Sequence, residues 1–305
     1  MNELQKRLEA SILAGRAMHA YLFSGVDPDM TEGAAKSAAS LMHYGKKDLS
    51  RLNMDPDHFE YEGTVSVSDF RDVIRPEIYR ETFGKTGRTV IFKNAHLLSV
   101  MVQNAMLKVL EEPPEKTHFI LTGNEYGILP TIRSRCMTIR FPASDVEDVK
   151  LMLMAEGASE KDAERSALMS GGIAARAKRL YSDEGFRELR GSMITALIAA
   201  MNGAPELNRP KVKRDKAELT ECGELMLLAA HDMLLIRCGL DPEYCPDRAE
   251  ELKKASSRFT IGELSSIIDK LRDNAERLAT NAPGASAFDR LFAEIGLMGL
   301  SKRSR

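Results

Sequence analysis

The stretch TVIFKNAHLLSVMVQNAMLKVLEEPPEKTHFILTG, residues 89–123, decides the fold. It begins and ends with short apolar runs, TVIFKN (89–94) and HFILTG (118–123), that are rich in β-branched and aromatic residues. Between them, apolar residues recur at helical spacing until Pro113 and Pro114. This succession is typical of parallel strands joined by a crossover helix. Two further runs, AYLFSG (20–25) and CMTIRF (136–141), complete the pattern of an α/β domain with a parallel sheet.

After Pro142 the strand signals cease, and the rest of the sequence predicts only helices. The segment 144–157 has a candidate helix cap at Ser144, followed three residues later by Glu147, and a second short helix is expected over 160–169. Longer amphipathic stretches follow at 186–201, 216–239, 249–257, 261–279 and 285–300. The polar, basic segment 202–218 predicts a loop between two of them.

Composition excludes several classes of protein. The 305 residues are 43% hydrophobic, which can supply cores for two or three globular domains. With 43 Lys plus Arg against 45 Asp plus Glu, the formal net charge is -2, so no global field attracts nucleic acid. The amino-terminal segment lacks the features of a secretory signal, which predicts a cytoplasmic protein. The four cysteines form no CxxC pair, so we expect reduced, buried thiols and no metal site.

The turn after the first predicted strand lies where a phosphate-binding loop would be, because helix-terminal amides and a lysine ammonium together hold the anion. Laid on the pattern GxxxxGK[ST], Gly25 matches, but Met30, Thr31 and Glu32 replace the second glycine, the lysine and the hydroxyl residue. Asp27 would add a further carboxylate that repels phosphate. Taken alone, the segment favours an ordinary surface turn between a strand and a helix over a degenerate phosphate loop.

The next strand favours the degenerate phosphate site. An ATPase of this class has an acidic residue, often Asp-Glu, directly after the apolar run, to hold magnesium and align water. Here Lys93 and Asn94 stand at those positions. Both halves of the apparatus therefore occur in the expected order, and both lack the groups that the chemistry requires.

The most specific segment is QNAMLKVLEEPPEKTHFILTGNEYGILPTIRSRCMTIRF, residues 103–141. It resembles the clamp-loader branch of the AAA+ proteins, in which Leu-Glu-Glu-Pro-Pro (here 110–114) leads to a sensor strand and then to a Ser-Arg-Cys motif, here Ser134, Arg135 and Cys136. Residues 19–25, 93–99 and 170–180 also resemble landmarks of that branch. Because the ATPase motifs are broken, the chain resembles the delta-prime family of bacterial DNA polymerase III, not the motor subunits.

The resemblance implies three domains: a RecA-like AAA+ core over 1–142, a helical lid over 143–182 and an all-α collar over 183–305. It implies a place in a pentameric ring with gamma/tau-type motor and delta-type subunits, which loads a sliding clamp onto primer-template DNA in a DNA-directed DNA polymerase holoenzyme. No intrinsic ATPase activity, no membrane contact and no bound cofactor are expected, since the partner subunits bind the ATP.

Within that family Arg135 would act as an arginine finger on the γ-phosphate held by a neighbouring subunit. The alternative is a surface arginine that pairs with a carboxylate or a strand end. For Lys108, Glu111 and Glu112, an interface role and a plain charged helix end are both open. Cys136 is expected to be packed and unreactive.

Two departures from the family pattern bear on cofactors. Many relatives carry a four-cysteine zinc module after the helix of the phosphate loop, but residues 43–63 contain no cysteine, so zinc is not predicted. In the lid, Ala175 stands where motor subunits have a sensor arginine, and Arg176 is out of register. An active ATPase with an unusual loop and a stand-alone regulatory AAA+ relic are the competing hypotheses, which ATP and DNA binding by the isolated chain would separate.

Overall fold

The computed structural model describes residues 3–63, 65–84, 86–205, 216–279 and 284–303. The chain divides into two compact units, residues 1–143 and 144–305. The first holds every strand among the described residues, and the second is helical. The division agrees with the predicted change after Pro142, while the split of the second unit into lid and collar stays a prediction.

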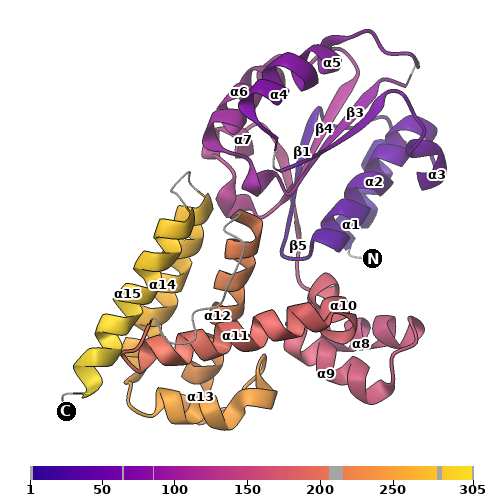
Figure 1. The fold of residues 1–305 in the computed structure, drawn as a ribbon. Helices are drawn as coiled ribbons and strands as arrows, with labels where there is room; N and C mark the ends of the chain where they lie inside the picture. Colours follow the sequence, from indigo (N-terminus) through magenta and orange to yellow (C-terminus); the bar gives the residue numbers. More distant parts are fainter. Residues whose placement is uncertain (1–2, 64, 85, 206–215, 280–283, 304–305) are drawn as a thin grey trace. The chain divides into compact units, whose positions relative to one another are not determined.

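The first unit is built on a five-stranded parallel sheet in the order β2-β3-β4-β1-β5 (Figure 1). Its strands are β1 Ala20–Gly25, β2 His58–Glu62, β3 Arg88–Lys93, β4 Thr117–Gly123 and β5 Met137–Phe141. The four predicted strands are confirmed to within a residue at either end. The edge strand β2 was not predicted, because HFEYE alternates apolar and charged residues over only five positions.

Both faces of this sheet are covered by helices, as a parallel sheet requires. One apolar core packs strand residues such as Leu22 and Phe119 against α6, α7 and the α4–α5 segment, while the other packs Phe23 and Ile120 against α1 and α2. The bounds of these helices are α1 Glu3–Leu13, α2 Pro28–Tyr44, α3 Leu49–Leu52, α4 Val67–Asp69, α5 Arg75–Tyr79, α6 Val100–Glu111 and α7 Pro130–Arg133.

The crossover helix α6 begins and ends for local reasons. Ser99 caps it by accepting a hydrogen bond from the amide of Val102 at 3.3 Å, so the three residues before Val100 stay outside the helix that the sequence predicts. The pair Pro113–Pro114 ends it, since neither residue can donate to the preceding turn. The two prolines leave Glu111 as the last helical residue.

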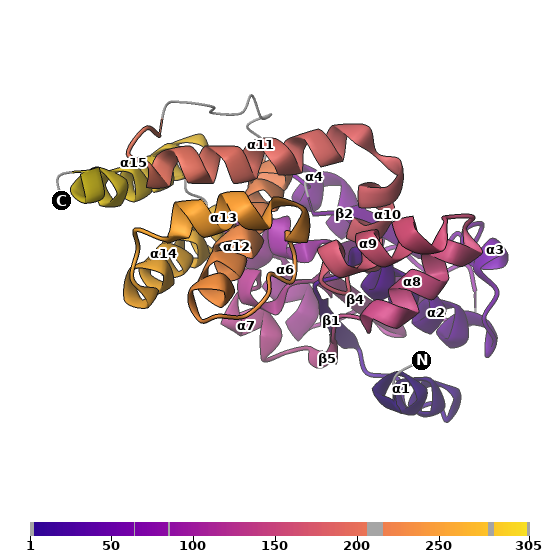
Figure 2. The ribbon, with the colours of Figure 1, turned by 90° about the horizontal axis from the view of Figure 1, so that it is seen from below.

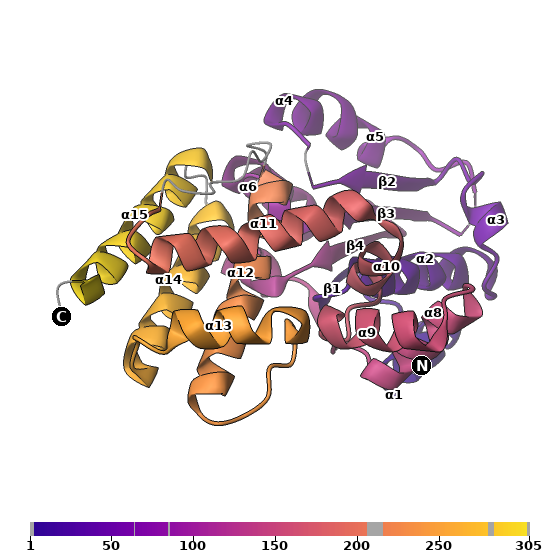
Figure 3. The ribbon, with the colours of Figure 1, turned by 60° about the horizontal axis from the view of Figure 1, so that its bottom comes forward.

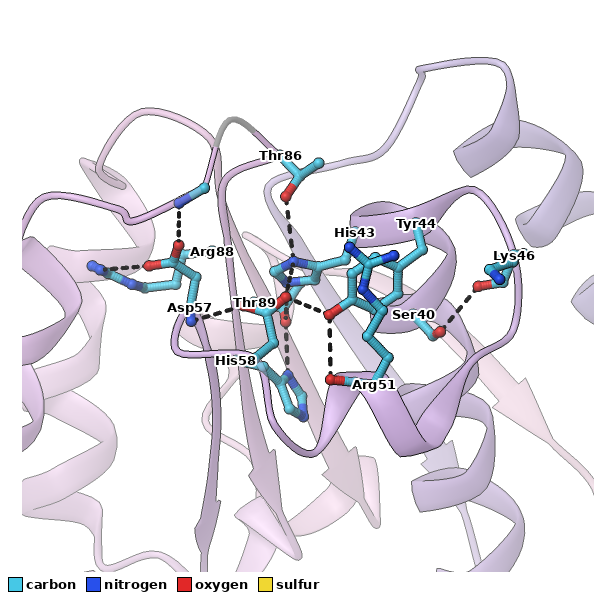
Figure 4. Close-up of polar contacts among 12 residues, drawn as sticks. Ser40, His43, Tyr44, Lys46, Arg51, Asp57, His58, Thr86, Arg88 and Thr89 are labelled. Atoms are coloured by element: carbon cyan, nitrogen blue, oxygen red, sulfur yellow. Dashed lines mark hydrogen bonds and ion pairs between the residues drawn. The ribbon is translucent and has the colours of Figure 1, made fainter.

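A buried polar network fixes the amino ends of β2 and β3 against α2 (Figure 4). His43 and His58 both hydrogen-bond the hydroxyl of Thr89, at 3.0 and 2.8 Å. Asp55 accepts from the hydroxyl of Tyr44 and lies 3.4 Å from His43. Within residues 43–63, where no zinc module was predicted, this network joins the end of α2 to the start of β2.

Arg88 forms a second buried anchor beside the same network (Figure 4). Its guanidinium is 1% exposed, donates to the carbonyls of Ile78 and Arg80, and lies 3.4 Å from Asp57. The carbonyls belong to the carboxyl end of α5, where a cation also interacts favourably with the helix dipole. The α4–α5 segment is thereby tied to the sheet.

The second unit consists of helices that form two apolar clusters, one in α8–α10 and one mainly in α11–α15. Figures 2 and 3 show α8, α9 and α10 gathered together, and α14 beside α15. The bounds are α8 Val146–Ala155, α9 Glu160–Ser170, α10 Ala174–Ser182, α11 Glu184–Met201, α12 Lys216–Arg237, α13 Ala249–Ser256, α14 Ile261–Ala279 and α15 Gly284–Arg303. Every predicted helix of this region is present.

Three details of the second unit differ from the sequence prediction or lie beyond the description. Helix α8 begins one residue later than proposed, because Asp145 is its N-cap residue and the amide of Ser144 instead donates to the carbonyl of Gly172. Cys238 is exposed rather than buried. Most of the predicted loop 202–218 lies outside the described residues.

Candidate functional site

The connection from β1 to α2 is too short to wrap around a phosphate. Strand β1 ends at Gly25 and helix α2 already begins at Pro28, so only Val26 and Asp27 lie between them. Met30 and Thr31, which align with the second glycine and the lysine of the motif, are therefore residues of the first helical turn. The open loop that would cradle an anion is absent from this part of the described chain.

The amides at the start of α2 are already satisfied by the chain itself. Pro28 has no N–H, and the side chain of Asp27 accepts from the amides of Asp29 and Met30 at 3.0 and 3.4 Å. The amide of Thr31 donates to the carbonyl of Asp27. A bound phosphate would need these same donors. The carboxylate of Asp27, which is 2% exposed, therefore occupies the role of the anion.

Thr31 closes the remaining space. Its hydroxyl donates to the carbonyls of Asp27 and Pro28, and the residue is 1% exposed. Its methyl group lies so near Gly25 that a Cβ added there would come within 2.8 Å. Where a lysine would extend toward phosphate, a short side chain is turned back onto its own helix.

The predicted metal position holds an internal cluster of charges. Lys93 Nζ lies 2.5 Å from Glu62 and 3.6 Å from Glu60, and the hydrogen bond to Glu62 raises the pKa of Lys93. The side-chain amide of Asn94 donates to Glu32 at 3.4 Å. Burial raises the pKa of Glu32, against the opposing effect of Lys93. The structure thus brings Glu32, Lys93 and Asn94 together.

These residues do not fit magnesium and ATP. Magnesium prefers carboxylate oxygens, but here an ammonium stands at the metal position and the nearby carboxylates are engaged with lysines and Asn94. We call the β1–α2 connection, the first turn of α2, and Lys93 and Asn94 the cradle. Within the described residues of this cradle, no side chain replaces the missing phosphate-binding lysine. Arg176, beside Ala175, donates to the carbonyl of Ser170 and to Glu224.

The Ser134-Arg135-Cys136 motif lies at the opposite, amino ends of the parallel strands. Strands β1 and β5 pair in parallel with Tyr21 opposite Met137 and Gly25 opposite Phe141. Arg135 therefore precedes the amino end of β5, whereas the cradle follows the carboxyl end of β1. Four residues of strand separate the two ends by about 13 Å at about 3.3 Å per residue. Arg135 therefore lies at the other end of the strands from the β1–α2 connection of its own chain.

Arg135 is held by contacts with two different helices. Its guanidinium donates to the carbonyl of Thr131 in α7 at 2.7 Å and to Glu111 at the end of α6 at 2.5 Å. Its side chain is 34% exposed. Ser134 Oγ also donates to the carbonyl of Thr131. Arg135 thus pairs with a carboxylate, as the alternative interpretation of this residue predicts.

Cys136 packs against the core beneath the motif, and burial raises the pKa of its thiol to about 12. Such a thiol stays protonated at neutral pH, which agrees with the predicted packing role.

Several residues of these sites were missed or left open by the sequence reasoning. Asp27 was read only as a charge that repels phosphate, although Asp before Pro at a helix start is a common capping pattern. The partners of Lys93 come from the unpredicted strand β2. Glu125, next to the sensor strand, forms a bidentate pair with Arg140 at 2.6 and 2.9 Å, and this pair lowers the pKa of Glu125.

Comparisons with known proteins agree with the family resemblance. Residues 1–145 match the family described as DNA polymerase III, delta subunit. Subunit tau of Escherichia coli is 33% identical over 159 residues, which are 46% of this chain and 24% of that protein. Subunit delta-prime of Bacillus subtilis is 28% identical over 218 residues, 64% of each chain, and that of Pseudomonas aeruginosa is 31% identical over 149 residues, 46% of this chain and 44% of that protein. The match therefore spans less than two thirds of these relatives.

A solved structure of a gamma subunit-related protein from Thermotoga maritima covers 97% of this chain and 100% of its own, at 17% identity and a TM-score of 0.45. Among the described residues, none of the helices combines the length and apolar character needed to cross a bilayer.

Proposed function

We propose that this chain, which is similar to clamp-loader subunits of DNA polymerase III, is a delta-prime-type subunit that hydrolyses no ATP and supplies Arg135 to a neighbouring ATPase. The observation that carries the proposal is the placement of the two motifs. The filled cradle lies beyond the carboxyl end of β1, and Arg135 lies before the amino end of β5. In a ring of similar subunits, opposite edges of one sheet face different neighbours.

The absence of hydrolysis follows from the cradle. Asp27 takes the amides that would bind phosphate, Thr31 replaces the ammonium, and Lys93 replaces the metal-binding carboxylate. Each loss alone weakens a phosphoryl-transfer site, since catalysis there consists almost entirely of positioning and charge stabilisation. All three residues lie at the carboxyl ends of the parallel strands.

Arg135 suits the γ-phosphate of an adjacent site because of its shape and charge. A guanidinium remains charged and donates two parallel hydrogen bonds to phosphate oxygens. Supplied in trans, such an arginine is worth on the order of a thousandfold or more in phosphoryl transfer. Hydrolysis then depends on assembly, because neither subunit alone has a complete site.

The partners follow from the same proposal. They are gamma/tau-type motor subunits and a delta-type subunit in a pentameric ring, which acts on a sliding clamp and primer-template DNA in the cytoplasm. The names of the matched relatives, subunits tau and delta-prime, support this assignment. The lid and collar assigned to residues 143–182 and 183–305 belong to this proposal, with the helical second unit as the assembly region.

A motor subunit is the second candidate, because several matched relatives are tau subunits. Equilibrium titration of the isolated chain with ATP separates the two functions. A delta-prime-type chain binds ATP weakly or not at all, and purified chain that hydrolysed ATP by itself would exclude the proposal.

The role of Arg135 is tested in a reconstituted loader. Arg135→Ala is expected to leave the mass of the complex unchanged and to lower ATP hydrolysis stimulated by clamp and DNA by about tenfold or more. Arg16→Ala, at an exposed arginine that precedes β1 on the same edge of the sheet, is the control for a lost positive charge. Normal turnover by the Arg135→Ala loader would remove Arg135 from the mechanism.

A further inference from the structure

Arg135 has a partner from another part of the first unit, and the contact fixes where its guanidinium lies. Glu111, the last residue of α6, accepts a hydrogen bond from Arg135 Nη2 at 2.5 Å. Arg135 Nη1 donates to the carbonyl of Thr131 at 2.7 Å and lies 3.4 Å from Ser134 Oγ. Helices α6 and α7 share one apolar core, so both anchors stand on packed elements.

The backbone of Glu111 is itself well held. Pro113 and Pro114 end the helix, and the amide of Glu112 donates to the carbonyl of Lys108. The hydroxyl of Tyr79, from α5, donates to the carbonyl of Glu112 at 3.2 Å. The neighbouring carboxylate of Glu112 is exposed and makes no ion pair within the described residues. One of two adjacent glutamates therefore contacts the arginine, and the other does not.

The contacts leave room for a phosphate on the same guanidinium. An arginine has five N–H donors, and its three contacts here use at most three of them. The two that remain are the number that a bidentate contact to phosphate oxygens requires. Glu111 and Thr131 can thus hold the side chain while it binds an anion.

We propose that Glu111 is a positioning residue for the arginine finger: it holds Arg135 in one orientation before and during contact with a neighbour's γ-phosphate. The inference rests on the proposed function of Arg135. A free arginine on a surface samples many rotamers, and a small misplacement of a group that contacts the transferred phosphoryl costs rate steeply. The pair is exposed enough that its effect on folding is small.

The sign of the effect distinguishes positioning from plain electrostatics. A carboxylate close to a γ-phosphate repels it, so removal of its charge alone would strengthen the attraction between Arg135 and phosphate. If Glu111 instead competed with phosphate for Arg135, loss of the pair would also raise the rate of hydrolysis. A loss of rate on neutralising Glu111 is therefore expected only if Glu111 orients the guanidinium.

The experiment uses the reconstituted loader with Glu111→Gln, the control Glu112→Gln, and Arg135→Ala, and measures stimulated hydrolysis against ATP concentration. We expect Glu111→Gln to lower kcat by about three- to tenfold, because the neutral amide oxygen of glutamine holds the charged guanidinium less firmly than the carboxylate does. The KM for ATP should stay within about twofold, because the finger acts on the transferred phosphoryl group. Glu112→Gln should match the unchanged loader. Thermal unfolding and complex mass should be the same for both glutamate variants.

A double-mutant cycle shows whether Glu111 acts through Arg135. In the Arg135→Ala background, adding Glu111→Gln should change kcat by less than about 1.5-fold, since the group that it orients is gone. Unchanged or raised kcat in Glu111→Gln alone, or a full further loss in the double variant, overturns the inference. If Arg135→Ala itself has no effect, the proposed function fails as well; if only Glu111→Gln has none, the proposed function stands.

Discussion

The replacement Asp27→Ala tests whether the start of α2 is sealed by the chain's own carboxylate. The change removes an acceptor for two amides at a position that is 2% exposed. Loss of an N-cap acceptor costs about 0.5–2 kcal/mol, and the buried setting places this one near the upper end. At about 2–4 °C per kcal/mol, a loss of about 2 kcal/mol lowers the melting temperature of the affected unit by about 4–8 °C.

Far-UV circular dichroism suits the measurement, because the chain has no tryptophan. Asp27→Asn keeps an acceptor and should cost only a few tenths of a kcal/mol, as should Asp29→Ala, an exposed acid in the same turn. The freed amides should still bind no ATP in calorimetric titration, because Thr31 and Lys93 remain. A melting temperature equal to that of the parent protein would refute the capping role, and tight ATP binding would refute the argument that three losses disable the site.

Three further predictions concern buried polar groups. Arg88→Met leaves the carboxylate of Asp57 buried without its cation, and should lower the free energy of unfolding by about 3–5 kcal/mol in urea denaturation, part of which Asp57→Asn in addition should restore. Burial lowers the pKa of His43 and His58, so the unfolded chain binds more protons and stability should fall as pH drops below about 6.5, by at most about 1.4 kcal/mol per pH unit for each histidine; His58→Gln should flatten this slope in melts from pH 7.5 to 5. Asn274 is 3% exposed, and neither of its amide atoms has a hydrogen-bond partner among the described residues. Asn274→Leu should therefore raise the free energy of unfolding by about 1 kcal/mol, and a lower value would mean that the amide has partners in solution.

The sequence predicted those parts of the fold that depend on local pattern. The runs at β1, β3 and β4 are nearly continuous and buried because both faces of the sheet are covered, and such runs stand out against charged flanks. Strand β5 was predicted as well, although it is an edge strand in which exposed and buried residues alternate. Helix α6 was found because its apolar spacing ends at two prolines. Strand β2 was missed because its five residues alternate apolar and charged side chains and none of them is fully buried, which gives a weak signal.

The sequence names candidate site residues but not the contacts that their side chains make. Alignment to a motif placed Thr31, Lys93 and Asn94 at the cradle, since motif spacing survives the loss of its chemistry. It could not give the pairs of Lys93 with Glu60 and Glu62, because these join residues more than thirty positions apart through a strand that was not predicted. Long-range polar pairs depend on register and rotamers, which one sequence does not encode in any local pattern.

The two ends of the parallel strands carry different sites, the filled cradle at the carboxyl ends and Arg135 at the amino ends. In a ring of similar subunits joined head to tail, each interface combines the nucleotide site of one member with the arginine of the next. Under the proposed function this chain completes one interface through Arg135, while its own cradle, filled by Asp27 and Thr31, leaves the interface on the other side without hydrolysis. A ring that contains one such subunit therefore has fewer hydrolysing interfaces than members. Counting nucleotides bound per complex at saturating ATP would measure this directly, and one nucleotide for every member of the ring would contradict it.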